Sequence, residues 1–139
     1  MKKPPIHPQR GYLALAIVLV CASYLLNWLS MGNVVWLGFY FGFVSLFSLI
    51  VYIGILVLLL IDLSHRPLSK QRLVAVFFIT LACCFWMSNR AYTIFKQLRT
   101  IDQSFERIGE GWILFIGSNL FIHYSVKKSY YIDYHRHTL

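Results

Sequence analysis

The stretch VVWLGFYFGFVSLFSLIVYIGILVLLLI, residues 34–61, contains 28 residues and no charged side chain. A helix needs ~20 consecutive apolar residues to cross ~30 Å of hydrocarbon, and this stretch exceeds that length. The apolar run is continuous rather than alternating, which favours a helix over a strand of a membrane barrel. We therefore predict a membrane-spanning helix over residues 34–61.

Three further apolar blocks flank this stretch, over residues 11–31, 73–95 and 111–126. The chain of 139 residues is 58% hydrophobic and only 13% charged, about half the charged share of an ordinary soluble domain. We expect an all-α integral membrane protein: a single domain of four transmembrane helices in two antiparallel hairpins. The apolar part of the first block exceeds the ~15 residues of a signal peptide and lacks a small-x-small cleavage pattern, so it should remain as a helix.

Lysine and arginine are distributed unequally between the two sides of this expected bundle. With residues 1–10 inside, nine basic residues fall on the inner side and four on the outer side. Cytoplasmic loops collect such residues, so we expect a cytoplasmic arm over residues 1–10 and a cytoplasmic tail over residues 127–139. This predicts a multi-pass protein of a bacterial-type plasma (inner) membrane. The formal net charge of +8 then faces lipid head groups, and nucleic acid is not an expected partner.

Residues 96–109, between the third and fourth blocks, have a helical pattern of their own. Apolar side chains recur from Leu98 to Ile108 at three- and four-residue steps, with charged residues between them. This period predicts an extracytoplasmic amphipathic helix. This segment either lies on the membrane surface or extends the third helix outside the membrane and packs on the bundle, or it serves as a lid or a partner-docking face.

Asn89 and Arg90 stand side by side before the third block ends. A helical rise of 1.5 Å per residue places Arg90 about 25 Å across the bilayer, where its charge can reach the outer surface. Asn27 should reach a similar height, and Glu110 begins the fourth block. We expect a polar cluster in which Arg90 pairs with Glu110 or Glu106 beside Asn27 and Asn89. The alternative is that Arg90 only anchors the interface.

Small and polar residues inside the blocks indicate how the helices would pack. Gly38, Gly42 and Ser45 are four and three residues apart, which on a helix forms a face that another helix can approach closely. This face either packs within the bundle or forms the seam of a homo-oligomer. Three polar residues of the fourth block are expected to form hydrogen bonds between helices: Ser118, Asn119 and His123.

Neither a metal ion, a cofactor nor a catalytic site is expected. His123 has no second histidine at matching depth in a helix with which to hold a haem. Cys83 and Cys84 point about 100° apart on a helix, which suits neither a metal ion nor an exchangeable pair. His135 and His137, one residue apart, form only a weak metal motif. The chain is therefore not expected to be an enzyme.

These features favour a non-catalytic protein that binds another membrane protein, either as an accessory subunit of a membrane assembly or as an immunity-like protein. In size and topology the expected bundle resembles small four-helix immunity proteins against membrane toxins, although no shared motif carries the resemblance. The alternative is a small oligomeric channel or transporter, with the Gly38 face as its seam and a polar mouth near Arg90. The expected partners are thus the lipid bilayer and another membrane protein, or further copies of the chain.

Overall fold

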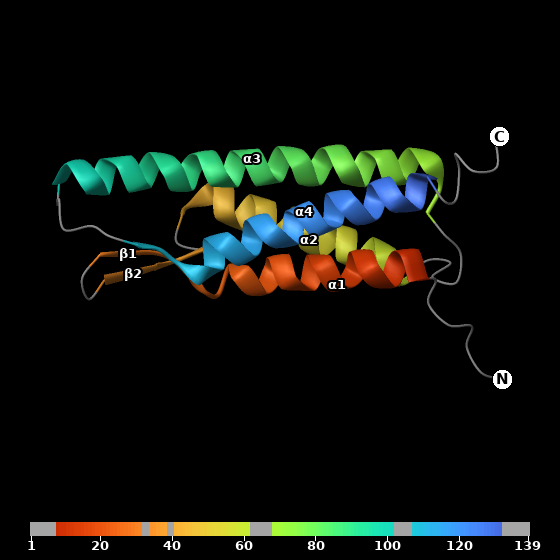
Figure 1. The fold of residues 1–139 in the computed structure, drawn as a ribbon, viewed down its shortest axis with the longest axis horizontal. Coiled ribbons are helices and arrows are strands. Elements are labelled where there is room, and N and C mark those ends of the chain that lie inside the picture. Colours follow the sequence, from red (N-terminus) through yellow and green to blue (C-terminus); the bar gives the residue numbers. More distant parts are fainter. Residues whose placement is uncertain (1–7, 32–33, 39–40, 62–67, 102–106, 132–139) are drawn as a thin grey trace.

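The computed structural model of this chain describes residues 8–31, 34–38, 41–61, 68–101 and 107–131. Its fold is mainly helical, with four helices, as the sequence predicts (Figure 1). The helices are α1 (Pro8–Ser23), α2 (Phe43–Ile61), α3 (Lys70–Ile101) and α4 (Glu110–Tyr130). Three short strands accompany them: β1 (Asn27–Met31), β2 (Val34–Leu37) and β3 (Arg107–Ile108). Glu106, His135 and His137, and most of the expected arm and tail, lie outside the described residues.

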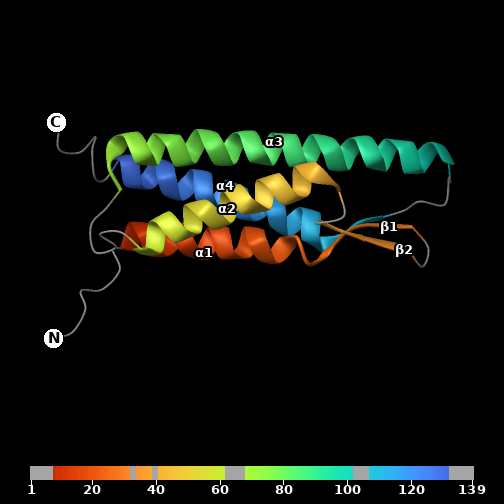
Figure 2. The ribbon, with the colours of Figure 1, turned by 180° about the vertical axis from the view of Figure 1, so that it is seen from behind.

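The helices lie side by side, α1 and α3 running in one direction and α2 and α4 in the other (Figure 2). α1 packs against α4 and α2, and α4 also packs against α3, whereas α2 and α3 contact each other less closely than any of these pairs. Two helices are long and apolar enough to cross a membrane: α2, and α3 over Lys70–Gln97. α1 is apolar but shorter.

The expected helices over residues 11–31 and 34–61 are wrong at their adjoining ends. Between α1 and α2, strands β1 and β2 form an antiparallel pair in which Leu29 lies opposite Trp36. β3 adds to the other side of β1, giving the strand order β2-β1-β3. The strand sequences are rich in Val and Trp, and a Gly-Asn dipeptide between two such runs is typical of a hairpin. Length and hydropathy alone do not separate such strands from a continuing helix.

The segment over residues 96–109 agrees with the expected extension of the third helix at its start and differs from the expected helix at its end. α3 continues to Ile101, because the intervening KQLRT contains no Gly or Pro and mostly good helix formers. Arg107 and Ile108 form β3 instead of helix, and Gly109 precedes α4. At the other end α4 extends to Tyr130, four residues into the expected tail. Likewise α1 begins at Pro8, within the expected arm, where proline is tolerated in a first helical turn.

Polar side chains form hydrogen bonds between segments at the end of the bundle where α1 begins and α2 ends. Arg10 is only 3% exposed, and its Nη1 donates to the carbonyl oxygens of Leu58 (3.4 Å) and Leu59 (3.2 Å). A cation at the last carbonyls of a helix also interacts favourably with the helix dipole. The Gln9 Oε1 accepts the backbone N–H of Leu68 at 2.7 Å, just before α3. Arg10 is therefore a packing residue as well as one of the basic residues of this end.

Candidate functional site

Trp28, on β1, lies where the small sheet meets the four helices. Its side chain is fully buried, and its indole Nε1 donates to the carbonyl of Ser23 at 2.7 Å. Four aromatic rings surround it, with centroids 4.9 to 6.2 Å away: Tyr24, Phe41, Trp112 and Phe115. The Trp112 ring stacks almost parallel, at 6°. The sequence did not predict this cluster, because Trp28 was expected within the membrane-spanning helix over residues 11–31 and lies on a strand instead.

Close backbone approaches around Trp28 explain the glycines of this region. A Cβ on Gly38 would lie 2.6 Å from the Trp28 Nε1 and 2.7 Å from the Tyr24 Cα. A Cβ on Gly111 would lie 2.6 Å from the Trp28 Cδ1, and one on Gly109 would overlap the backbone carbonyl of Asn27. Each glycine thus lets a backbone segment reach the Trp28 cluster.

The expected helix-packing face of Gly38, Gly42 and Ser45 is wrong, because α2 begins only at Phe43. Gly42 has a positive φ of 84°, a conformation that glycine adopts readily, and its carbonyl accepts the Ser45 backbone N–H at 3.1 Å. The Ser45 hydroxyl is buried and donates to the same carbonyl at 2.7 Å. Gly42 therefore shapes the start of α2, while Gly38 makes its close approach to Trp28 from outside any α-helix.

Hydrogen bonds between side chains cross the interior of the bundle at two depths. The Tyr52 hydroxyl of α2 donates to Asn119 Oδ1 of α4 at 2.7 Å, and Asn119 Nδ2 donates to the Phe115 carbonyl at 2.9 Å. Nearer the end of α4, the Thr80 hydroxyl lies 3.2 Å from the His123 Nε2. These bonds link α4 to α2 and to α3, respectively.

Ser118, the third expected interhelical residue, has a buried hydroxyl with no hydrogen-bond partner in the described part of the chain. A further polar contact was not expected: the Tyr24 and Ser48 hydroxyls lie 2.6 Å apart. The spacing of polar residues could have indicated this contact. Ser45, Ser48 and Tyr52 follow one another at three- and four-residue steps, so they share one face of α2.

The Tyr52–Asn119 bond leads to a first prediction. Asn119→Leu should lower the free energy of unfolding by about 1 kcal/mol, because the buried Tyr52 hydroxyl loses its acceptor. The contact of that hydroxyl with the Thr80 carbonyl, at 3.5 Å, is too long to replace it. The double variant Y52F/N119L should recover most of the loss. Unfolding in detergent, followed by circular dichroism, measures the free energy of unfolding of Asn119→Leu, Tyr52→Phe and the double variant.

Tyr124→Phe is the matched control for this prediction, because the Tyr124 side chain is exposed on α4. Removing its hydroxyl should leave the free energy of unfolding unchanged within about 0.5 kcal/mol. Strictly additive effects of the two substitutions in the double variant would show that the Tyr52–Asn119 bond contributes nothing.

The expected polar cluster around Arg90 is only partly brought together. Asn89 and Arg90 are exposed on α3, and Glu110 is exposed at the start of α4. No ion pair joins Arg90 to Glu110 among the described side chains, and Glu106 lies outside that set. Asn27 is half-buried beside Gly109, and its Oδ1 is buried without a hydrogen-bond partner in the described residues. The structure thus brings Asn27 to the start of α4 but forms no Arg90–Glu110 pair.

An apolar groove of about 560 Å³ opens between α2 and α3. It is lined by Phe47 and Val51 of α2 and by four residues of α3: Ile79, Ala82, Cys83 and Trp86. The small Ala82 and Cys83 side chains lie between larger ones, and the Phe47 and Trp86 rings meet edge to face at 5.6 Å. The four α3 residues recur at three- and four-residue steps, a signal in the sequence that the expectation for Cys83, which concerned only metal binding and thiol exchange, did not include.

Within the described ranges, no three His, Cys, Asp or Glu side chains cluster in a way that could hold a metal ion. Cys21, Cys83 and Cys84 are free thiols. Among the described residues, the fold thus defines a helical protein with two helices long and apolar enough to cross a membrane. Comparison with known proteins adds no family to this description, because no protein-family model, no curated protein and no solved structure matches the chain.

Proposed function

We propose that this chain is a small, non-catalytic, multi-pass protein of a bacterial-type plasma membrane that acts by binding another membrane protein through the α2–α3 groove. All four helices cross the bilayer in two antiparallel hairpins, with both termini cytoplasmic and the small sheet on the outer side. Accessory subunits of membrane assemblies act by binding another membrane protein, and so do immunity-like proteins that block a pore-forming toxin.

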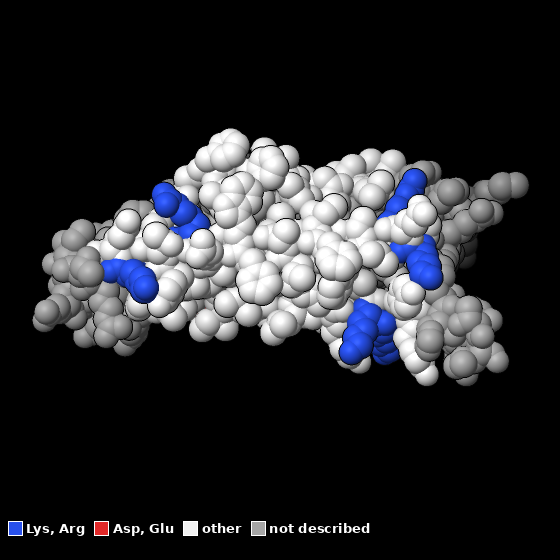
Figure 3. Space-filling view, turned by 90° about the horizontal axis from the view of Figure 1, so that it is seen from above, with Lys and Arg blue, Asp and Glu red and all other residues white. Residues whose placement is uncertain are grey.

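The surface supports this placement in a membrane. Lys and Arg side chains lie near both ends of the molecule, with an uncharged surface between them (Figure 3). Large apolar side chains are exposed along all four helices, among them Leu15, Ile50, Phe78 and Leu120. α1 spans only about 24 Å by its 16 residues, so the apolar turn from Tyr24 to Leu26 completes its crossing.

The observation that carries the binding function is the shape of the α2–α3 groove. Lipid offers helices no hydrophobic driving force for association, so they associate by close packing over small residues. The exposed Ala82 provides such a site, above the buried Cys83, and Phe47 and Trp86 provide aromatic contact area beside it. The relatively sparse contact between α2 and α3 leaves this face open to a helix of another protein.

The oligomeric channel has less support. Its expected seam is lost, because Gly38 and Gly42 precede α2 and Ser45 is buried. Its expected mouth lacks an ion pair between Arg90 and Glu110 among the described residues. A single peak at the size of a monomer in detergent would count against the channel, and ion flux in liposomes would favour it.

Ala82→Trp tests the groove, because an indole there fills the space over the small residues. Purified from its native membrane, the tagged chain should co-isolate one membrane protein in a fixed ratio, identified by mass spectrometry. The A82W variant should lose at least about tenfold of that partner, since overfilling a packed interface typically costs more than 1.4 kcal/mol.

Leu120→Trp is the matched control, because Leu120 lies exposed on α4 and lines no part of the groove. It should retain the partner at the wild-type ratio, and both variants should remain in the membrane fraction. Equal recovery of the partner with A82W and with the wild type would rule out the groove as the binding site.

A further inference from the structure

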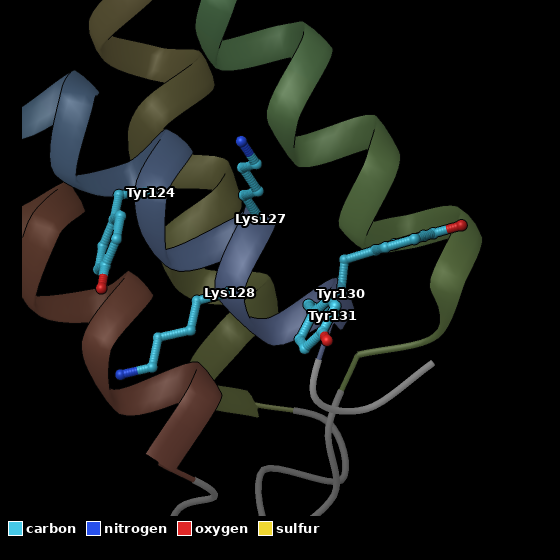
Figure 4. A pocket seen from close by; sticks show the side chains of 5 residues that line it. All are labelled: Tyr124, Lys127, Lys128, Tyr130 and Tyr131. Atoms are coloured by element: carbon cyan, nitrogen blue, oxygen red, sulfur yellow. The ribbon is translucent and has the colours of Figure 1, made fainter. Parts of the chain in front are cut away.

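The last two turns of α4 form a second hollow, distinct from the α2–α3 groove. Its volume is about 580 Å³, and five residues of one short segment line it (Figure 4): Tyr124, Lys127, Lys128, Tyr130 and Tyr131. Tyr124, Lys128 and Tyr131 follow at steps of four and three residues, so they share one face of α4, with Lys127 beside them. We call this set the α4 basic face.

Aromatic and cationic groups of the α4 basic face are both accessible. The Tyr124 and Tyr131 side chains are 61% and 57% exposed, and the two lysines are exposed as well. In Figure 4 the Lys128 side chain reaches toward α1 on the same side as Tyr124, while Lys127 extends in another direction. Tyrosine rings suit the boundary between acyl chains and head groups, and their hydroxyls can donate to ester or phosphate oxygens.

Positive charge dominates around this face in the described residues. The Lys70 Nζ, at the start of α3, lies 5.4 Å from the centroid of the Tyr130 ring and adds a third cation. Glu110 is the one carboxylate that the structure describes, and it stands at the opposite end of α4. Asp62 and Asp133 belong to segments outside the described ranges. An anionic ligand would therefore complement the described charges.

An apolar path leads from this face along α4 toward the middle of the helix. Tyr124 is preceded at helical spacing by Leu120, Gly117 and Ile113, all of them exposed. Gly117 adds no side chain to this path, and a Cβ placed on it would meet nothing within 4 Å. A soluble anion would use only the lysines, whereas an acyl chain attached to the anion would also cover this path.

From this combination we infer that the α4 basic face binds the head group of an anionic phospholipid. The phosphate lies against the Lys128 ammonium group, with Lys127 adding positive charge at the same turn, the Tyr124 hydroxyl donates to the glycerol region, and one acyl chain runs over Gly117. This inference rests on the membrane placement in the proposed function, and it adds a preferred lipid that the binding of a partner protein does not require.

The experiment uses the full chain in bilayer discs made of phosphatidylcholine with about a tenth of phosphatidylglycerol. After extraction in mild detergent, native mass spectrometry counts the retained lipids. The wild type should retain one phosphatidylglycerol, and K127Q/K128Q should retain about tenfold less, since each basic residue at the membrane surface contributes to anionic lipid binding. Lys96→Gln combined with Arg90→Gln, which removes the same charge from exposed positions elsewhere, should change retention less than twofold.

Two outcomes would overturn the inference: equal loss of phosphatidylglycerol in both double variants, or equal retention of phosphatidylcholine by the wild type. Free glycerol phosphate, added in excess, should not displace the lipid, and complete displacement would assign the site to a soluble phosphate instead. Resistance of each variant to carbonate extraction reports membrane insertion separately. Failure there would contradict the proposed function, whereas failure of lipid retention alone would contradict only this inference.

Discussion

Gly109→Ala is expected to lower the free energy of unfolding by about 3 kcal/mol, at the upper end of the cost of overpacking a well-packed site. The added Cβ would overlap the backbone carbonyl of Asn27, which cannot move aside as a flexible side chain could. The Gly109 N–H also donates to the Trp28 carbonyl at 2.7 Å, so the glycine is fixed from both sides. Its backbone, at φ −81° and ψ 167°, is open to alanine. The expected cost is therefore steric and not conformational.

Two other glycines of the same chain provide matched controls for this prediction. A Cβ on Gly54 in α2 or on Gly117 in α4 would meet nothing within 4 Å. Alanine there should keep or raise the free energy of unfolding, by up to about 1 kcal/mol, because it favours a helix over glycine. Unfolding in detergent, followed by circular dichroism, compares the three variants. If G109A were as stable as G54A, the close approach to Asn27 would be disproved.

The four helices could be predicted from the sequence because long, uninterrupted apolar runs favour helices. Leu46 to Leu60, for example, contains no residue that suits a turn except Ser48 and Gly54, and the structure keeps this whole stretch in α2. The helix ends could not be predicted in the same way. Trp28 and Leu29 are as apolar as the residues of α1, so hydropathy carries no signal that the chain leaves the helix at Ser23.

The candidate site was less predictable than the fold, because it depends on which faces meet. Asn119 and His123 do hydrogen-bond across helices, but their partners Tyr52 and Thr80 come from segments 67 and 43 residues away. Spacing within one helix identifies a polar face without identifying the group opposite. Arg90 illustrates the opposite case. It was expected at the same depth in the membrane as Glu110, but residues at one depth need not face each other, and no bond between the two forms among the described residues.

The groove between α2 and α3 illustrates a second reason why the candidate site could not be predicted from the sequence. Its α3 side is visible in the sequence as Ala82 and Cys83 between larger residues at helical steps. Whether such a face is filled or open depends on how extensively the neighbouring helix packs on it, and α2 contacts α3 over fewer residues than α1 contacts α4. The spacing of residues within one helix does not determine the extent of that contact.

Trp28→Ala is expected to lower the free energy of unfolding by about 3–5 kcal/mol, the range for removing a buried aromatic side chain. Trp28 has no exposed surface, and it contacts the rings of Tyr24, Phe41, Trp112 and Phe115. Trp28→Phe should cost about 1–2 kcal/mol, because it keeps a ring but loses the 2.7 Å bond to the Ser23 carbonyl. Unfolding in detergent should rank the wild type above W28F and W28F above W28A.

Trp86→Ala is the control for Trp28→Ala, since it deletes the same side chain from a position that is 43% exposed in the α2–α3 groove. Its free energy of unfolding should fall by only about 1–2 kcal/mol, less than for Trp28→Ala, because nearly half of the Trp86 surface is already exposed. Recovery of the co-isolated partner should nevertheless fall, whereas W28F should retain the partner. A Trp86 variant as unstable as W28A would mean that the groove residues hold the bundle together and are not free to bind a partner.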